Sequence, residues 1–178
     1  MILAAPTLLN VSTACSLHPD YNRKGLLAHI QQEFVLDWQG IHGANHWARV
    51  LHHGRAIARQ WNADPLVVEL FAFLHDSCRL DDWGDPKHGD RGAQFALDMQ
   101  GQFYQLSGPQ LDALCQAIRL HSDGHTSTNP TIQTCWDSDR LDLGRVGIRP
   151  SAKYLSELAA TRIEIGYALS VKGGKKAD

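Results

Sequence analysis

The sequence predicts a single compact domain built from α-helices alone. Apolar residues recur at steps of three and four along most of the 178 residues, and no long stretch alternates apolar and polar side chains as a half-buried strand does. A chain of this length suits one domain, and internal repeats and linker-like tracts are absent from the sequence. We therefore expect six or seven helices around a buried central helix, in one domain covering residues 1–178.

The first two predicted helices cover Tyr21 to Trp38 and Gly43 to Asn62. In the second, Trp47 and Val50 belong to an apolar stripe, while arginines occupy other faces, which is typical of an amphipathic helix. The stripe passes close to His46. We therefore expect this imidazole on the core side of the helix.

The central helix is predicted over Leu66 to Leu74, a nearly continuous apolar segment. Asp64 followed by Pro65 is a typical helix start, with an N-cap and a proline at the first helical position. Val67 and Phe71 would equally suit a buried strand. The helical segments on both sides favour a buried helix.

A polar loop rich in Asp, Gly and Pro follows from Arg79 to Gly92, and a loop of this length inside a compact domain tends to be functional. Four more helices are predicted after it, at Gly92 to Gln100, Gln110 to His121, Thr131 to Leu143 and Tyr154 to Val171.

The charge balance excludes binding to a polyanion by bulk charge. Lys and Arg number 17 and Asp and Glu 19, which gives a net charge of −2. Neither nucleic acid nor an acidic membrane surface is therefore an expected partner. The unusual features are ten histidines and an excess of Asp over Glu among the acids. Together these features suggest a metal site.

The cysteines and the chain ends indicate in which cellular compartment the protein is expected. The four cysteines form no C-x-x-C pair, which favours a reduced, cytoplasmic protein. The apolar segment of residues 1–20 lacks a basic start and contains Pro6 and Asn10, so it matches a secretory signal poorly. Whether it docks on its own domain or on a second copy in a homodimer stays open. No membrane-spanning run occurs, and residues 172–178 are expected to form a flexible tail.

The strongest local feature is the His75-Asp76 pair at the end of the apolar central segment. Burying an imidazole and a carboxylate there without partners is unfavourable by several kcal/mol. A helix-end histidine with a capping aspartate would be a purely structural explanation. A metal ion is the alternative, with His46 upstream and Asp139 downstream as further ligands from other helices.

Three segments in this order resemble the HD superfamily of metal-dependent phosphohydrolases. They are IHGANHWARV from Ile41, FLHDS from Phe73 and DSDRLD from Asp137, within a motif-bearing core of about residues 41–150. The resemblance implies an all-α HD-domain-like bundle that hydrolyses a phosphomonoester, phosphodiester or nucleotide. It also implies one or two divalent metal ions per chain, with Mn, Fe, Ni, Co, Zn and Mg all open. The implied metal ligands are His46, His75, Asp76 and Asp139.

Two positions within these segments have competitors. In the first segment, His42 competes with His46, and the helical register with Trp47 favours His46. In the last segment, Asp139 aligns best with the final Asp of the family. Asp142, three residues on, shares the face of Asp139, and we expect it, like Asp137, to support the ligands by hydrogen bonds.

Further histidines allow a second metal. Some relatives, such as the cyclic-dinucleotide phosphodiesterases and the mixed-valence di-iron oxygenases, add His ligands between the His-Asp pair and the final Asp. By this resemblance His88 and His121, with His125 beside them, would hold a second ion, and Asp76 would bridge the two metals. The alternatives are that His88 and His121 contact substrate or cap their helices. Whether His88 and His121 bind a second metal or contact substrate, they and Asp76 are candidate catalytic residues.

A small phosphate ester or nucleotide is the expected partner, and its phosphate needs cations near the metal. The candidates are Lys87, Arg91, Arg140 and Arg145, although such residues are often solvated or paired with acids. The leading hypothesis is hydrolysis through a metal-activated water. A di-iron oxygenase using the same residues and a non-catalytic metal-binding module are the alternatives.

Overall fold

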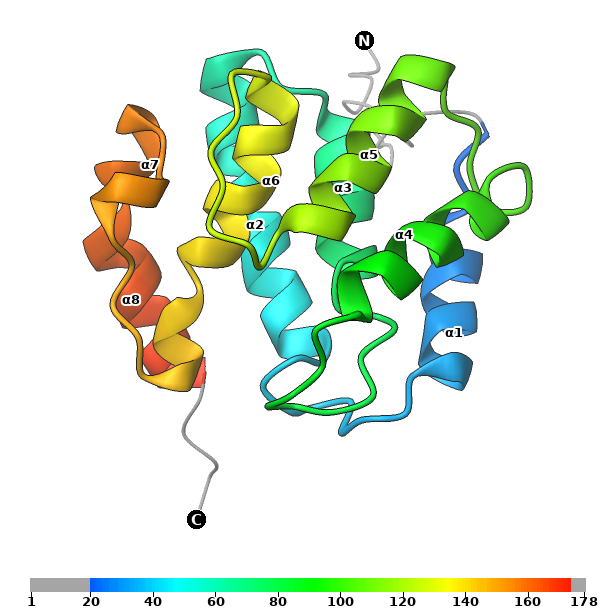
Figure 1. The fold of residues 1–178 in the computed structure, drawn as a ribbon, viewed down its shortest axis with the longest axis horizontal. Coiled ribbons are helices and arrows are strands. Elements are labelled where there is room, and N and C mark those ends of the chain that lie inside the picture. Colours follow the sequence, from blue (N-terminus) through cyan, green and yellow to red (C-terminus); the bar gives the residue numbers. More distant parts are fainter. Residues whose placement is uncertain (1–19, 174–178) are drawn as a thin grey trace, which may run out of the picture.

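The structure, a computed structural model, describes residues 20–173. Within that range the chain forms eight α-helices and two short 3₁₀ helices (Figure 1). The α-helices are α1 (Arg23–Glu33), α2 (Ala44–Trp61), α3 (Pro65–Leu74), α4 (His88–Met99), α5 (Gly108–Leu120), α6 (Pro130–Arg140), α7 (Glu157–Ala160) and α8 (Ile163–Gly173). The 3₁₀ helices are η1 (Leu143–Val146) and η2 (Ala152–Tyr154). The described residues contain no β-strand, so the predicted all-α class is confirmed.

Helix α3 is the central helix of the bundle. Every residue from Leu66 to Leu74 is buried, and α3 packs against α2, α4, α5 and α6. Its start is fixed by Asp64, whose carboxylate accepts hydrogen bonds from the backbone amides of Leu66 (2.9 Å) and Val67 (3.1 Å). The interpretation of this segment as a strand is therefore wrong, because capping and contact with helices on all sides favour the helix.

Glu69 is the charged residue within this apolar helix, and α1 and α2 neutralise it. The Arg23 guanidinium lies 3.3 Å from one carboxylate oxygen, and Tyr21 donates a hydrogen bond of 3.2 Å to the same oxygen. Arg55 donates to the other oxygen at 2.5 Å. A buried carboxylate needs such partners, so this ion pair network ties α1 and α2 to α3.

The largest differences from the predicted boundaries concern α1, α4 and the last helix. Helix α1 ends at Glu33, because Phe34 is extended and packs edge-on against Trp38 and Trp47. Helix α4 begins at His88, four residues earlier than predicted. The predicted last helix is interrupted, since Ser156 caps the short α7 and α8 starts only at Ile163.

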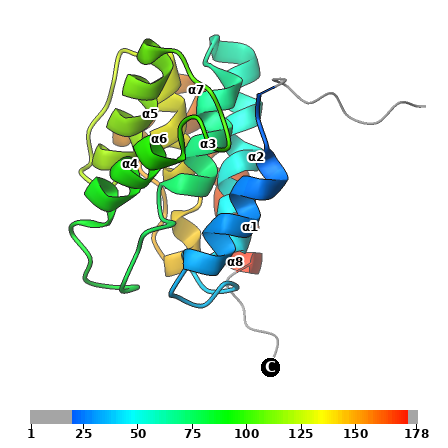
Figure 2. The same cartoon turned by 90° about the vertical axis from the view of Figure 1, so that its right-hand side faces the viewer.

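The order of the helices brings polar residues to one end of the bundle. The amino ends of α2 and α4 lie in the lower half of Figure 1, and α3, α5 and α6 run downward toward them, with the carboxyl ends of α5 and α6 near mid-height (Figures 1 and 2). The connections 34–43 and 79–87 lie at the same end and are joined by a 2.8 Å contact between His42 and Asp82. The segments that carry the candidate ligands therefore meet there.

Predictions about the chain ends fall largely outside the described residues. The apolar segment lies almost wholly in residues 1–19, and most of the predicted tail lies in residues 174–178. Among the helices of residues 20–173, none combines the length and the apolar character needed to cross a bilayer.

The early start of α4 depends on Gly89, where α4 approaches the end of α5 closely. A Cβ at this position would lie 2.6 Å from the Arg119 carbonyl oxygen and 3.0 Å from that of Ile118. We expect Gly89→Ala to destabilise the fold by about 1–3 kcal/mol, because the backbone of α4 or α5 must move to make room for the added Cβ. Urea unfolding measures this change. Gly108→Ala is the control, since its Cβ meets nothing within 4 Å; equal destabilisation by both variants would contradict the prediction.

His53 in α2 gives the fold a pH dependence of its own. The side chain is fully buried, and neither ring nitrogen has a hydrogen-bond partner among the described residues. Burial lowers the pKa of His53 from 6.5 to about 4. As the pH falls from 6.5 toward 4, the unfolded chain therefore gains a proton that the folded chain excludes, and stability decreases.

We expect His53→Leu to reduce this loss of stability on acidification. The measurement is the free energy of unfolding in urea at several pH values between 4.5 and 7.5, with a chelator present. His52→Leu is the matched control, because His52 is the exposed neighbour of His53 on the same helix. Identical pH profiles for the His53 variant and the wild type would contradict the assignment.

Candidate metal centre

Two of the candidate ligands are the residues that cap helices at their carboxyl ends. His75 caps α3 and His121 caps α5. The Nδ1 atom of His75 donates to the Phe71 carbonyl at 3.1 Å, and that of His121 donates to the Ile118 carbonyl at 2.7 Å. A carbonyl only accepts, so Nδ1 carries the proton in both rings. Both Nε2 atoms therefore point into the interior, at helix ends that favour cations.

His46 and His88 are oriented in the same way from the amino ends of α2 and α4. The Nδ1 atom of His46 donates to the Asp142 carboxylate at 2.7 Å, and Arg49 holds that carboxylate with two further hydrogen bonds. The Nδ1 atom of His88 contacts the Asp85 carbonyl. Each imidazole is thus held by its outer nitrogen, which is the usual arrangement of metal-binding histidines.

His46, His75, Asp76 and Asp139 form the first ligand set. The Nε2 atoms of His46 and His75 lie 3.0 Å apart. Asp76 Oδ2 lies 3.6 and 3.5 Å from these two nitrogens, and Asp139 Oδ1 lies 3.4 and 3.8 Å from them. All four side chains are buried.

The donor atoms of the first ligand set fit a divalent metal ion. Asp76 Oδ2 and Asp139 Oδ1 are buried and have no hydrogen-bond partner in the described part of the chain. Imidazole and carboxylate donors bind many divalent ions at about 2.0–2.2 Å. An ion between them would satisfy both oxygens and both nitrogens, whose lone pairs otherwise face each other.

Asp76, His88 and His121 form the second ligand set. The Nε2 atoms of His88 and His121 lie 3.0 Å apart, and they lie 3.6 and 3.4 Å from Asp76 Oδ1. The two oxygens of the Asp76 carboxylate therefore face different histidine pairs. Donor atoms close enough together to ligate an ion occur in three overlapping groups of buried side chains: His46, His75 and Asp76; His75, His121 and Asp139; and Asp76, His88 and His121.

The surroundings keep ligands of the first set deprotonated. Burial lowers the pKa of His75 to about 3, although the neighbouring Asp76 and Asp139 oppose this shift. Burial alone would raise the pKa of Asp139, but Arg145 and the surrounding histidines outweigh it and set the value at about 2. At neutral pH these residues are therefore a free base and a carboxylate, as metal binding requires.

The ligand sets open into a cavity of about 440 Å³. Asp76, His121 and Asp139 line its inner part. Exposed aromatic surface lies farther out, with Trp83 82% and Tyr154 38% exposed. The cavity is large enough for a small organic substrate.

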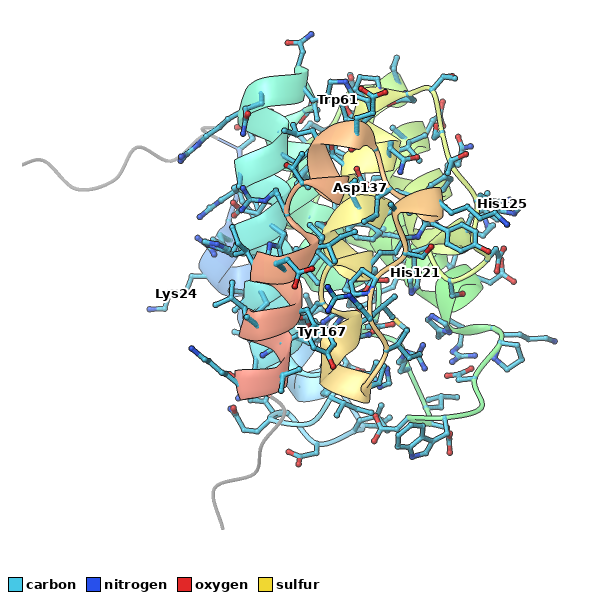
Figure 3. All side chains as sticks on the ribbon, turned by 90° about the vertical axis from the view of Figure 1, so that its left-hand side faces the viewer. Lys24, Trp61, His121, His125, Asp137 and Tyr167 are labelled. Carbon is cyan, nitrogen blue, oxygen red and sulfur yellow. The ribbon has the colours of Figure 1, made fainter. Side chains whose placement is uncertain are left out.

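The structure does not bring two of the predicted residues to the ligand sets. His125 is exposed in the connection between α5 and α6, at the edge of the view in Figure 3, whereas His121 lies inside. Asp137 is buried but faces α7, where its carboxylate accepts hydrogen bonds from Ser156 and Gln133. Asp137 and Asp139 are two residues apart on a helix and so point in opposite directions. Asp142, by contrast, lies behind His46.

The four predicted phosphate-binding cations have different surroundings. Arg145 lines the cavity, its guanidinium lies 3.7 Å from Asp139, and it also donates to the carbonyls of Ile41 and Asp142. Arg140 also lines the cavity, but it donates to the carbonyls of Tyr154 and His125 and so joins two loops. Arg91 donates to the Cys78 carbonyl, and neither Arg91 nor Lys87 lines the cavity. Arg145 is thus the predicted cation best placed for a phosphate.

Sequence reasoning missed several residues of the site. Arg79 contacts the candidate ligands, and Asp82 and Trp83 line the cavity, as does His42, which the sequence had offered only as a competitor of His46. Arg79 comes only three residues after Asp76, inside the polar loop that the sequence marked as functional, so its position was the available signal. Nothing in the pattern distinguished Trp83 from other loop residues.

Comparison with known proteins agrees with this geometry. The model of the HD domain matches residues 43–159. No protein of curated function matches the chain. The crystal structure of a predicted HD superfamily hydrolase from an uncultured Thermotogales bacterium has 23% sequence identity and a TM-score of 0.65, over 85% of this chain and 88% of that one. This likeness shows the shared fold, and the match of the domain model shows that the chain belongs to the HD domain family.

Proposed function

We propose that the protein is a metal-dependent phosphohydrolase acting on a small phosphate ester or nucleotide. One observation carries the proposal: two buried carboxylate oxygens, of Asp76 and Asp139, have no hydrogen-bond partner within residues 20–173 and face two imidazole nitrogens at the inner end of a cavity. A divalent ion is the species that such donors suit. The HD hydrolase fold supports a hydrolytic reaction.

The protein residues have separate tasks in this proposal. A divalent ion bound by the first ligand set would lower the pKa of a water molecule and polarise a phosphoryl oxygen. Asp142 and Arg49 hold the His46 ring in place. Arg145 offers a cation beside Asp139 for the phosphate, and Trp83 offers an apolar face for the rest of the substrate.

An HD-type di-iron oxygenase is the second candidate. The observation that favours it is the sharing of Asp76 between the two ligand sets. This candidate requires two iron ions per chain and consumption of oxygen with a suitable substrate. Hydrolysis of phosphate esters with one divalent ion per chain would exclude it.

Removing a ligand of the first set is expected to remove both metal and activity. We expect His46→Ala and Asp139→Asn to lose most of the bound metal and the metal-dependent hydrolysis, because each deletes one donor. The measurements are elemental analysis after dialysis against Mn²⁺ and hydrolysis of bis(p-nitrophenyl) phosphate and nucleoside monophosphates. Saturating Mn²⁺ should also raise the wild-type melting temperature, since ligand at 100 times its Kd stabilises by about 2.7 kcal/mol.

His52→Ala and Asp123→Asn are the matched controls, because both side chains are exposed. They should keep metal and activity at the wild-type level. Full metal content and unchanged hydrolysis in His46→Ala or Asp139→Asn would contradict the assignment. Stoichiometric metal without hydrolysis or oxygen consumption would instead indicate the non-catalytic module.

The role of Arg145 can be tested separately from metal binding. We expect Arg145→Met to lower kcat/KM for a phosphate ester by about 10- to 100-fold, because one charge-assisted contact to phosphate is lost. Metal content should stay unchanged. Arg59→Met, at an exposed position of α2, is the control. An unchanged kcat/KM in Arg145→Met would show that phosphate binds elsewhere.

A further inference from the structure

The second ligand set contains a cation of its own, the guanidinium of Arg79. Its Nε atom donates to Asp76 Oδ1 at 2.7 Å, and one of its terminal nitrogens lies 3.3 Å from His88 Nε2. These are two of the three atoms that would bind a second metal. The Arg79 side chain is only 13% exposed, so the contact is largely shielded from water.

The two ligand sets therefore differ in what they lack. In the first set, Asp76 Oδ2 and Asp139 Oδ1 have no hydrogen-bond partner among residues 20–173, although the Arg145 guanidinium lies 3.7 Å from Asp139 Oδ1. In the second set, Asp76 Oδ1 accepts a hydrogen bond from Arg79, and His88 Nε2 faces the same guanidinium. The two carboxylate oxygens of the first set therefore lack a hydrogen-bonded cation, whereas two of the three donors of the second set are already hydrogen-bonded to one.

The charge of Arg79 is permanent. A guanidinium does not lose its proton in a protein, so it cannot become neutral when a metal approaches. A divalent ion ligated by Asp76 Oδ1 and His88 would take over the electron pairs that Arg79 now contacts. It would also be repelled by the guanidinium at short range in a buried site.

We infer that Arg79 is the resident cation of the second ligand set and limits the protein to one metal ion per chain, held by His46, His75, Asp76 and Asp139. Arg79 thus determines metal stoichiometry. This inference rests on the proposed metal site, and it places the protein with hydrolases that use one ion. It also gives His88 and His121 a role other than ligation: His88 contacts Arg79 and His121, and His121 lines the cavity.

The test is the number of metal ions bound by Arg79 variants. Wild type and variants are dialysed against Mn²⁺, washed and measured by elemental analysis, and their spectra are recorded by electron paramagnetic resonance. We expect one Mn²⁺ in the wild type and two in Arg79→Met, with an exchange-coupled spectrum only in the variant. The double variant Arg79→Met/His88→Ala should return to one ion. Arg79→Lys, which keeps a cation, should bind one.

Arg119→Met is the control, because Arg119 pairs with Asp90 on the surface. It should bind one Mn²⁺, as the wild type does. If Arg79→Met does not fold, as judged by circular dichroism, His88→Ala in the wild-type background decides the question. That variant should keep its single ion, while His75→Ala loses it.

The outcomes separate the inference from the proposed function. Two ions in the wild type, or one ion in a folded Arg79→Met variant, would overturn the role of Arg79 and leave the metal site intact. Loss of an ion from His88→Ala would also overturn it. If neither the wild type nor any variant bound metal, the proposed function itself would be overturned.

Discussion

The structure at the lower end of the bundle depends on one buried carboxylate, that of Asp76. It follows the central helix directly, and its two oxygens face two different pairs of imidazoles. A charge at this depth is strongly unfavourable unless cations surround it. Its neighbours are Arg79 on one side and the candidate metal ligands His46 and His75 on the other. The helix ends, the loop that carries Arg79 and the cavity all lie around this buried charge.

The helices meet this requirement with their own termini. The carboxyl ends of α3 and α5 supply a histidine each, and the ring of each histidine donates a hydrogen bond to a carbonyl in the last turn of its own helix. The same bond fixes the tautomer that a metal needs. Close approach of α4 to α5 at Gly89 then brings His88 opposite His121. The same hydrogen bonds and close helix contacts therefore both shape the backbone and orient the imidazole rings.

Much of this arrangement could be predicted from the sequence, and the parts that could not have physical reasons. The central helix, His46 and the His75-Asp76 pair were predictable because helical periodicity and local order place them. The distinction between Asp137 and Asp139 needed the orientation of α6, since only one of two such residues can face the centre. Arg79 was missed, because a guanidinium on a polar loop has no periodicity that fixes its direction.

In the proposed metal site, the separation of the ligands along the chain has a consequence for how the protein would acquire an ion. His46 and Asp142 are 96 residues apart, and the donors between them come from four further segments. An unfolded chain cannot hold these atoms together, and closing such long loops is entropically unfavourable. The ion must therefore enter after the bundle has formed, through the cavity. Which metal the protein carries is then decided by exchange between the finished fold and the ions available in its surroundings, not during synthesis.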